Sequence, residues 1–146
     1  MKFLRYFLLA VLAALAILFI GTGFALLFNS RSVFDGLPDY YGLFNNHFVK
    51  DAGLAYLSSG IMLAIAVFHR RLRSAFAFCG ALFVVLHGIF HIVMVANGMV
   101  PSAYLTEEVV SVIGPALVTL TIVVLVHIVS SRSENGRSFP ALRDGI

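Results

Sequence analysis

Two pairs of ionisable residues interrupt apolar stretches of the chain, and within each pair the residues are four positions apart. His47 and Asp51 stand at the start of one apolar run, and His87 and His91 stand within the next. Residues four apart on a helix project from the same face, so each pair presents its side chains in one direction. Imidazoles and carboxylates bind metal ions and carry protons, and inside a membrane span such groups usually face the protein interior or a wet cavity.

The composition indicates an integral membrane protein. Of the 146 residues, 60% are hydrophobic and 12% are charged, and the mean hydropathy of +0.98 lies outside the range of soluble domains. The net charge of +3 does not indicate nucleic-acid binding, because the basic residues stand at the ends of apolar runs. Cys79 is the single cysteine, which excludes an intrachain disulfide and a CxxC redox motif.

Four apolar runs predict an all-α fold, a four-helix transmembrane bundle in one membrane domain over residues 1–129. A hydrocarbon core of about 30 Å requires about 20 helical residues, and each run is long enough. The expected spans cover residues 6–28, 47–68, 74–96 and 107–129, followed by a disordered tail over residues 130–146. A basic start before an apolar run is also typical of a signal peptide. The length of the first run and the lack of a clear A-x-A cleavage site favour an uncleaved span.

The basic residues predict how the bundle is oriented. Lys2 and Arg5 precede the first span, and three arginines between residues 70 and 73 follow the second. The positive-inside rule places both groups in the cytoplasm, so both chain termini are cytoplasmic and the protein is expected in the bacterial inner membrane. The loop over residues 29–46 then lies outside. Its length suits a functional cap or lid, and an interfacial spacer is the alternative.

The fourth span is expected to begin with helix-start chemistry on the external side. Thr106 is the predicted N-cap, with Glu107 and Glu108 in the first turn, where the helix dipole favours negative charge. Gly114 and Pro115 within the span predict a kink or a carbonyl without its helical partner.

This topology brings both pairs of ionisable residues into the outer half of the bundle, and a metal centre is the first interpretation. His47, Asp51, His87 and His91 form a ligand set for a transition metal such as zinc, copper or iron, with Glu107 or Glu108 as an additional ligand. We expect small and polar stripes to face the bundle interior on two spans. The stripes are His47, Asp51, Ala55 and Ser58 on the second span and Gly80, Val84, His87 and His91 on the third.

Other interpretations use the same residues. Redox or proton transfer needs proton carriers rather than ligands. A b-type haem held by His87 or His91 with His47 is less favoured, because four short spans must also enclose the macrocycle. The histidines can instead hydrogen-bond a membrane lipid headgroup or a quinone ring oxygen.

A purely structural role also fits these residues. Asp51 can pair with His47 or with His87 and hold two spans together, while helix-start chemistry alone accounts for Glu107 and Glu108. The chain would then be an accessory or assembly subunit that binds copies of itself or a larger membrane complex. Whether it is an enzyme stays open.

Two segments carry a family resemblance. NNHFVKDAGLAYLSSG at residues 45–60 and HGIFH at residues 87–91 resemble small bacterial four-span membrane proteins of the DoxX-like group in layout. The resemblance covers the topology and about thirty residues. It permits an association with quinone-linked redox complexes and implies no functional residue.

Overall fold

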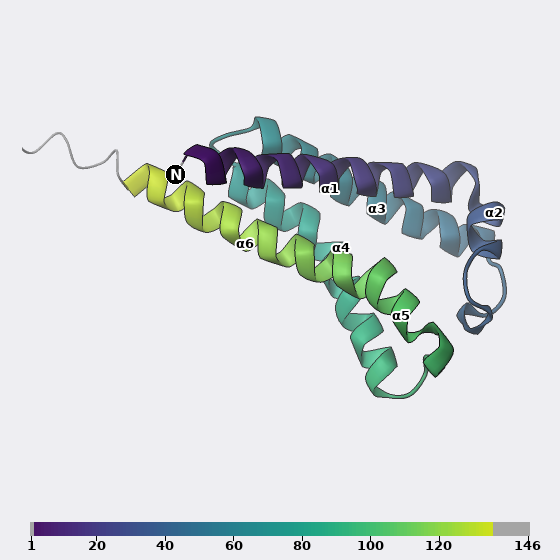
Figure 1. Cartoon of the computed structure of the whole chain (residues 1–146). Coiled ribbons are helices and arrows are strands. Elements are labelled where there is room, and N and C mark those ends of the chain that lie inside the picture. The colour runs from purple at the N-terminus through teal and green to yellow at the C-terminus, as the bar shows by residue number, and fades with distance from the viewer. Residues whose placement is uncertain (1, 136–146) are drawn as a thin grey trace, which may run out of the picture.

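A computed structural model describes residues 2–135 of the chain, with side chains described for residues 2–131. Four helices in this part are long and apolar enough to cross a membrane, and the described residues contain no strand (Figure 1). Three of them are α1 (Lys2–Phe28), α3 (Asn46–Phe68) and α4 (Arg73–Ala96). The fourth is composite and joins α5 (Leu105–Glu108), a π-helical turn η3 (Val109–Ile113) and α6 (Gly114–Asn135). The prediction of an all-helical fold with four helices long and apolar enough to span a membrane is confirmed.

Two connections lie at one end of the bundle, which we call the loop end. The first connection contains a short helix α2 (Ser30–Asp35) and a 3-10 turn η1 (Asp39–Tyr41), and the second contains a 3-10 turn η2 (Ser102–Tyr104). The opposite end, which we call the arginine end, holds the start of α1 and the tight turn between α3 and α4 (Figure 1).

Polar side chains bond the free backbone groups at both ends of α3. At the arginine end the buried Arg73 side chain donates from Nε to the Ala66 carbonyl at 2.9 Å and from Nη2 to the Val67 carbonyl at 3.0 Å. At the loop end the Asn45 side chain accepts from the backbone N–H groups of His47 and Phe48. These bonds serve backbone groups that have no partner within the helix.

Glycines bring α1 and α3 into close contact. A Cβ added at Gly60 would lie 2.7 Å from the backbone nitrogen of Ile20, and one added at Gly23 would lie 2.7 Å from the backbone nitrogen of Leu57. Larger residues at these points would push the helices apart, which is why small residues favour close helix packing in membranes. The contact fixes the rotation of α3 about its own axis.

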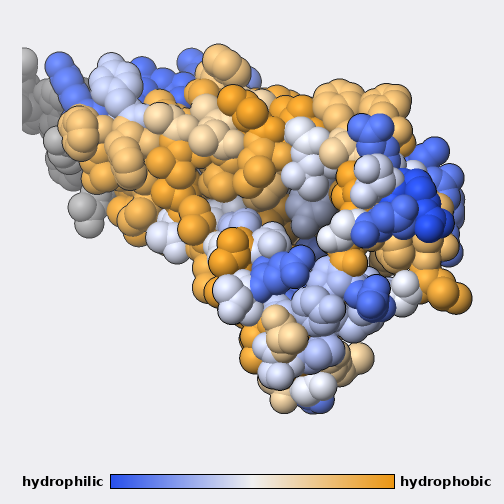
Figure 2. All heavy atoms as spheres, turned by 45° about the vertical axis from the view of Figure 1, so that its right-hand side comes forward, coloured by the Kyte–Doolittle hydropathy of each residue, from blue (hydrophilic) through white to orange (hydrophobic). Residues whose placement is uncertain are grey.

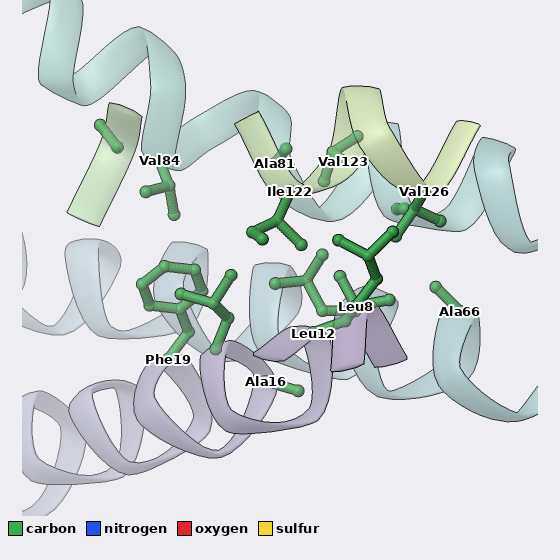
Figure 3. Close-up of a cluster of buried hydrophobic side chains, with 14 residues drawn as sticks. Leu8, Leu12, Ala16, Phe19, Ala66, Ala81, Val84, Ile122, Val123 and Val126 are labelled. Atoms are coloured by element: carbon green, nitrogen blue, oxygen red, sulfur yellow. The ribbon is translucent and has the colours of Figure 1, made fainter. Parts of the chain in front are cut away.

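The buried core lies between the four helices and is apolar. Figure 3 shows side chains of all four directed into one space, among them Leu12, Phe19 and Val123, which are 0–2% exposed. Ala66 and Ala81 complete it with small side chains from α3 and α4. This cluster contains no polar group, so chemistry must be sought elsewhere in the bundle.

At the loop end, the second half of α4 and the start of the composite fourth helix turn away from α1 and α3 (Figure 1). The two diverging segments stay packed on each other, because Gly88 of α4 has no side chain where the Cβ of Ala116 approaches. At the loop end the helices therefore form two diverging pairs, α1 with α3 and α4 with the composite fourth helix (Figure 1).

The helix start and the tail differ in detail from the sequence prediction. Thr106 is not an N-cap, because the helical turn already begins at Leu105 with Tyr104 before it. The helix α6 continues to Asn135, beyond the expected end at residue 129, and the rest of the predicted disordered tail lies outside the described residues.

Candidate functional site

A buried acid and a buried histidine meet at the loop end. His91 lies on the last turns of α4 and Glu108 at the end of α5, and each is 2% exposed. The distance between His91 Nδ1 and Glu108 Oε2 is 2.5 Å. Two ionisable groups withdrawn from water in this way are retained only when they are paired, so each residue makes the burial of the other tolerable.

Two tyrosines of the first connection donate further hydrogen bonds to the Glu108 carboxylate. The hydroxyls of Tyr40 and Tyr41 both donate to Oε1 of Glu108, the latter at 2.7 Å. Both phenols belong to the 3-10 turn η1, which ends at Gly42 in a left-handed conformation with φ of +89°. The connection therefore lies over the acid and is tied to it by two hydrogen bonds.

The two phenols are held in their protonated form. Burial, reinforced by the hydrogen bond to Glu108, raises the pKa of Tyr40 from its ordinary value of 10.0 to about 12. The same two causes, in the same order, raise the pKa of Tyr41 well above its ordinary value. At neutral pH both hydroxyls are donors, and the carboxylate is their acceptor.

His87 extends the group by one helical turn toward the middle of the bundle. Its ring centroid lies 4.6 Å from that of His91, and it stacks on Phe83 at 5.5 Å and meets Tyr56 edge to face at 6.1 Å. Within the described residues no hydrogen bond to the His87 ring nitrogens is found. Every buried side-chain nitrogen or oxygen in the described residues has a hydrogen-bond partner. The ring nitrogens of His87 have none, so they are accessible and not buried.

The accessible space beside His87 is a cavity of ≈ 310 Å³ between the two helix pairs. Its lining residues come from α1, α3, α4 and the composite fourth helix and are Leu18, Phe19, Thr22, Tyr56, Val84, His87, Val110, Ser111, Val112 and Pro115. Figure 2 shows a hollow on this side of the molecule, with hydrophilic and weakly polar residues gathered around it and hydrophobic residues over most of the remaining face.

The π-helical turn places Glu108 and the cavity next to each other. Pro115 has no N–H to offer to the preceding turn, and the N–H of Gly114 bonds the Val109 carbonyl five residues earlier instead of four. The predicted irregularity at Gly114 and Pro115 is therefore present as a widened turn. It adds a residue between the regular part of α6 and Glu108, which changes the direction in which Glu108 projects.

The structure separates the predicted site residues into two groups. His87 and His91 lie together with Glu108, but His47 and Asp51 pair with each other at 3.5 Å on the surface, with side chains 90% and 56% exposed. The predicted inward stripe on the second span is wrong, since His47, Asp51 and Ser58 are exposed. The close α1–α3 contact buries Gly53 and Gly60 on another face of α3 and turns this stripe outward.

The stripe predicted on the third span is confirmed. Gly80, Val84 and His91 are buried and His87 is half-buried.

Glu107, the other candidate acid, is exposed. Across residues 2–131 no cluster of three or more His, Cys, Asp or Glu side chains has the arrangement of a metal site.

Sequence reasoning missed the tyrosines. Tyr40 and Tyr41 lie in the external loop predicted over residues 29–46, and Tyr56 carries no signal within its apolar run. The one clue in the sequence is a pair of adjacent phenols in a loop that the predicted topology places at the same end of the bundle as Glu108. Their 67- and 68-residue separation from Glu108 hides the contact.

No family model, curated protein or solved structure matches the chain.

Proposed function

We propose that this chain is a multi-pass membrane protein whose loop end holds a proton-transfer site in support of a redox or proton-transfer reaction. The observation that carries the proposal is a series of neighbouring groups that hold or exchange protons, arranged from the first connection to the cavity. The series is Tyr40 and Tyr41, Glu108, His91 and His87.

Each group in the series has a defined part. The phenols are half-buried and reach the surface of the first connection, where they exchange protons with water. Glu108 accepts from both phenols and shares a proton with Nδ1 of His91. His91 and His87 are close enough for one water molecule or a small rotation of a ring to connect their nitrogens. His87 then gives a proton to, or takes one from, an atom in the cavity.

The orientation and location are part of the proposal. We infer that the loop end faces the periplasm of a bacterial inner membrane, because Lys2, Arg5 and the basic turn all lie at the arginine end. The site would then exchange protons with the periplasm and not with the cytoplasm.

The experiment measures exchange at the buried imidazoles. Protein labelled with nitrogen-15 histidine is placed in nanodiscs, and the rate at which the His91 and His87 ring N–H groups exchange with external deuterium is followed by NMR. The variant is Glu108→Gln, which keeps the size and one acceptor oxygen of the side chain. Glu107→Gln is the matched control, because the neighbouring acid has the same chemistry and is exposed.

We expect Glu108→Gln to slow the exchange at His91 by about 10²-fold, the low end of typical general acid–base effects, and Glu107→Gln to leave it unchanged. Whether the exchange rate falls or rises distinguishes two roles of Glu108, a proton carrier and an anchor for the first connection. If the acid only ties down the first connection, its loss opens the site to water and the exchange becomes faster. A faster or unchanged rate in a variant with a native circular dichroism spectrum overturns the proposal.

Elemental analysis of the same samples tests the competing metal centre. One bound zinc, copper or iron per chain, lost in both His87→Phe and His91→Gln, would make the imidazoles ligands instead of proton carriers. An accessory subunit without chemistry would show native exchange in all variants and loss of assembly in one of them.

A further inference from the structure

We infer that the cavity beside His87 binds the ring of a membrane-dissolved quinone. This inference rests on the proposed function and deepens it, because it names the kind of molecule that occupies the cavity beside His87. It depends on the polar groups of the cavity, the shape of its walls and its access from lipid.

Two hydroxyls that line the cavity differ from those of Thr119 and Thr121 in having no hydrogen-bond partner among the described residues. Thr119 and Thr121 of α6 donate to carbonyls four residues earlier, at 2.7 and 2.8 Å. For Thr22 and Ser111, which line the cavity, the described residues provide no such bond. In a hydrocarbon environment an unmade hydrogen bond is costly. These hydroxyls are therefore available to a ligand.

Tyr56 and His87 are available in the same way. Neither side chain has a hydrogen bond to another described residue, and both line the cavity from α3 and α4. Their rings meet at nearly a right angle, 84°, so a ligand beside them can accept hydrogen bonds from the phenol O–H and from an imidazole N–H. Donors on two different helices suit a ligand with oxygen atoms at separate positions.

The remaining walls favour a flat, apolar ring. Phe19 lies in the lining and is itself packed against Tyr56 at a centroid distance of 6.0 Å. Leu18, Val84 and Val110 supply aliphatic contacts. The volume of ≈ 310 Å³ is at the lower end of the range for small-molecule pockets, and it accommodates a substituted ring better than a whole lipid.

Access to the cavity is from the lipid side. Leu18 of α1 and Val110 of the π-helical turn line the cavity and are 49% and 68% exposed on the apolar part of the helices. A ligand that enters between them must already be dissolved in the membrane. No lysine, arginine or carboxylate belongs to the lining, so a phospholipid headgroup would find no counter-ion. An uncharged ring whose oxygens accept hydrogen bonds, such as that of a quinone, fits all of these constraints.

The test uses the absence of tryptophan from the chain. Leu18→Trp places a single tryptophan at the cavity, and Leu120→Trp places one on a lipid-facing position of α6, 41% exposed, outside the lining. Quenching of each by a short-chain ubiquinone is measured in nanodiscs. At position 120 we expect quenching that rises linearly with quinone concentration, as for quinone dissolved in the lipid. At position 18 we expect a saturable component in addition to the linear one.

Variants in the Leu18→Trp background identify the groups that bind. His87→Phe keeps a flat ring and removes both nitrogens, and Tyr56→Phe removes one hydroxyl. Each should weaken the saturable binding by about tenfold, the usual effect of one lost hydrogen bond to a ligand. Thr121→Val, which removes a hydroxyl outside the cavity, is the control and should have no effect.

The outcomes separate this inference from the proposed function. Linear quenching of equal strength at both positions overturns the quinone site, even if Glu108→Gln slows proton exchange as expected. Native mass spectrometry that finds a phospholipid retained by the wild type and lost in His87→Phe makes the occupant a lipid and also overturns it. Saturable binding together with unaltered exchange in Glu108→Gln keeps the site and removes the relay.

Discussion

Glu107 and Glu108 are consecutive acids in one helical turn, and the fold gives them opposite environments. Glu107 faces outward, whereas Glu108 is 2% exposed and accepts from two phenols and an imidazole. Removing one member of a buried ionic pair typically costs about 3 to 5 kcal/mol, because the other is left without compensation. The same truncation at an exposed acid costs little. The buried acid is therefore also a determinant of local stability.

The phenols give the loop end a defined pH dependence. Because the pKa of Tyr40 is raised from 10.0 to about 12, its stabilising contribution is fully present below pH 10 and is lost as the pH rises through about 12. Ultraviolet titration of tyrosinate in the folded protein should show Tyr40 and Tyr41 among the phenols that ionise late, and in Tyr40→Phe one late phenol disappears. Ionisation of all phenols near pH 10 in a folded sample contradicts the contacts with Glu108.

At the scale of elements, two features decide where these residues point. The glycine contact between α1 and α3 sets the rotation of α3, and the π-helical turn before Gly114 sets the direction of Glu108. Both are local departures from ordinary helix packing, and each moves a whole row of side chains. Widened turns of this kind are frequently found at functional sites.

The glycine contact can be tested by matched substitutions. In Gly60→Ala the new Cβ would lie 2.7 Å from the backbone nitrogen of Ile20, so the helices must separate, and we expect a loss of about 1 to 3 kcal/mol in stability. In Gly21→Ala, nothing lies within 4 Å of the new Cβ, and higher helix propensity should be neutral or stabilising by up to about 1 kcal/mol.

Thermal unfolding in detergent, monitored by circular dichroism, distinguishes the two variants. A lower Tm in Gly60→Ala and an unchanged or higher Tm in Gly21→Ala are expected. Equal effects in both would mean that α1 and α3 do not approach as closely as the structure shows.

At the scale of the whole molecule, polar and apolar regions are divided along the bundle. The cluster around Leu12, Phe19 and Val123 closes the four helices with apolar side chains alone, whereas the diverging helices at the loop end enclose the paired acid, the imidazoles and the cavity. A site that exchanges with only one side of the membrane needs this division, because the apolar core is a barrier to protons.

The orientation proposed for the membrane has a direct test. Cys79 is replaced by serine, and a single cysteine is introduced at Ser32 in the first connection or at Leu72 in the tight turn, both exposed. A membrane-impermeant maleimide added to intact spheroplasts should label position 32 and not position 72. Labelling of position 72 alone reverses the proposed orientation and directs the site toward the cytoplasm.

Local properties of the chain predict the four long apolar helices and their approximate limits, because a bilayer selects helix length and hydrophobicity directly. The helical spacing of Gly80, Val84 and His91 likewise predicts the inward face of α4. Which side chains meet, in contrast, follows from the tertiary structure. The rotation of α3 excluded His47 and Asp51 from the site, and the path of the first connection brought in Tyr40 and Tyr41 from almost seventy residues away. Helix rotation and loop path depend on contacts between distant segments, and such contacts leave no periodic signal in the chain.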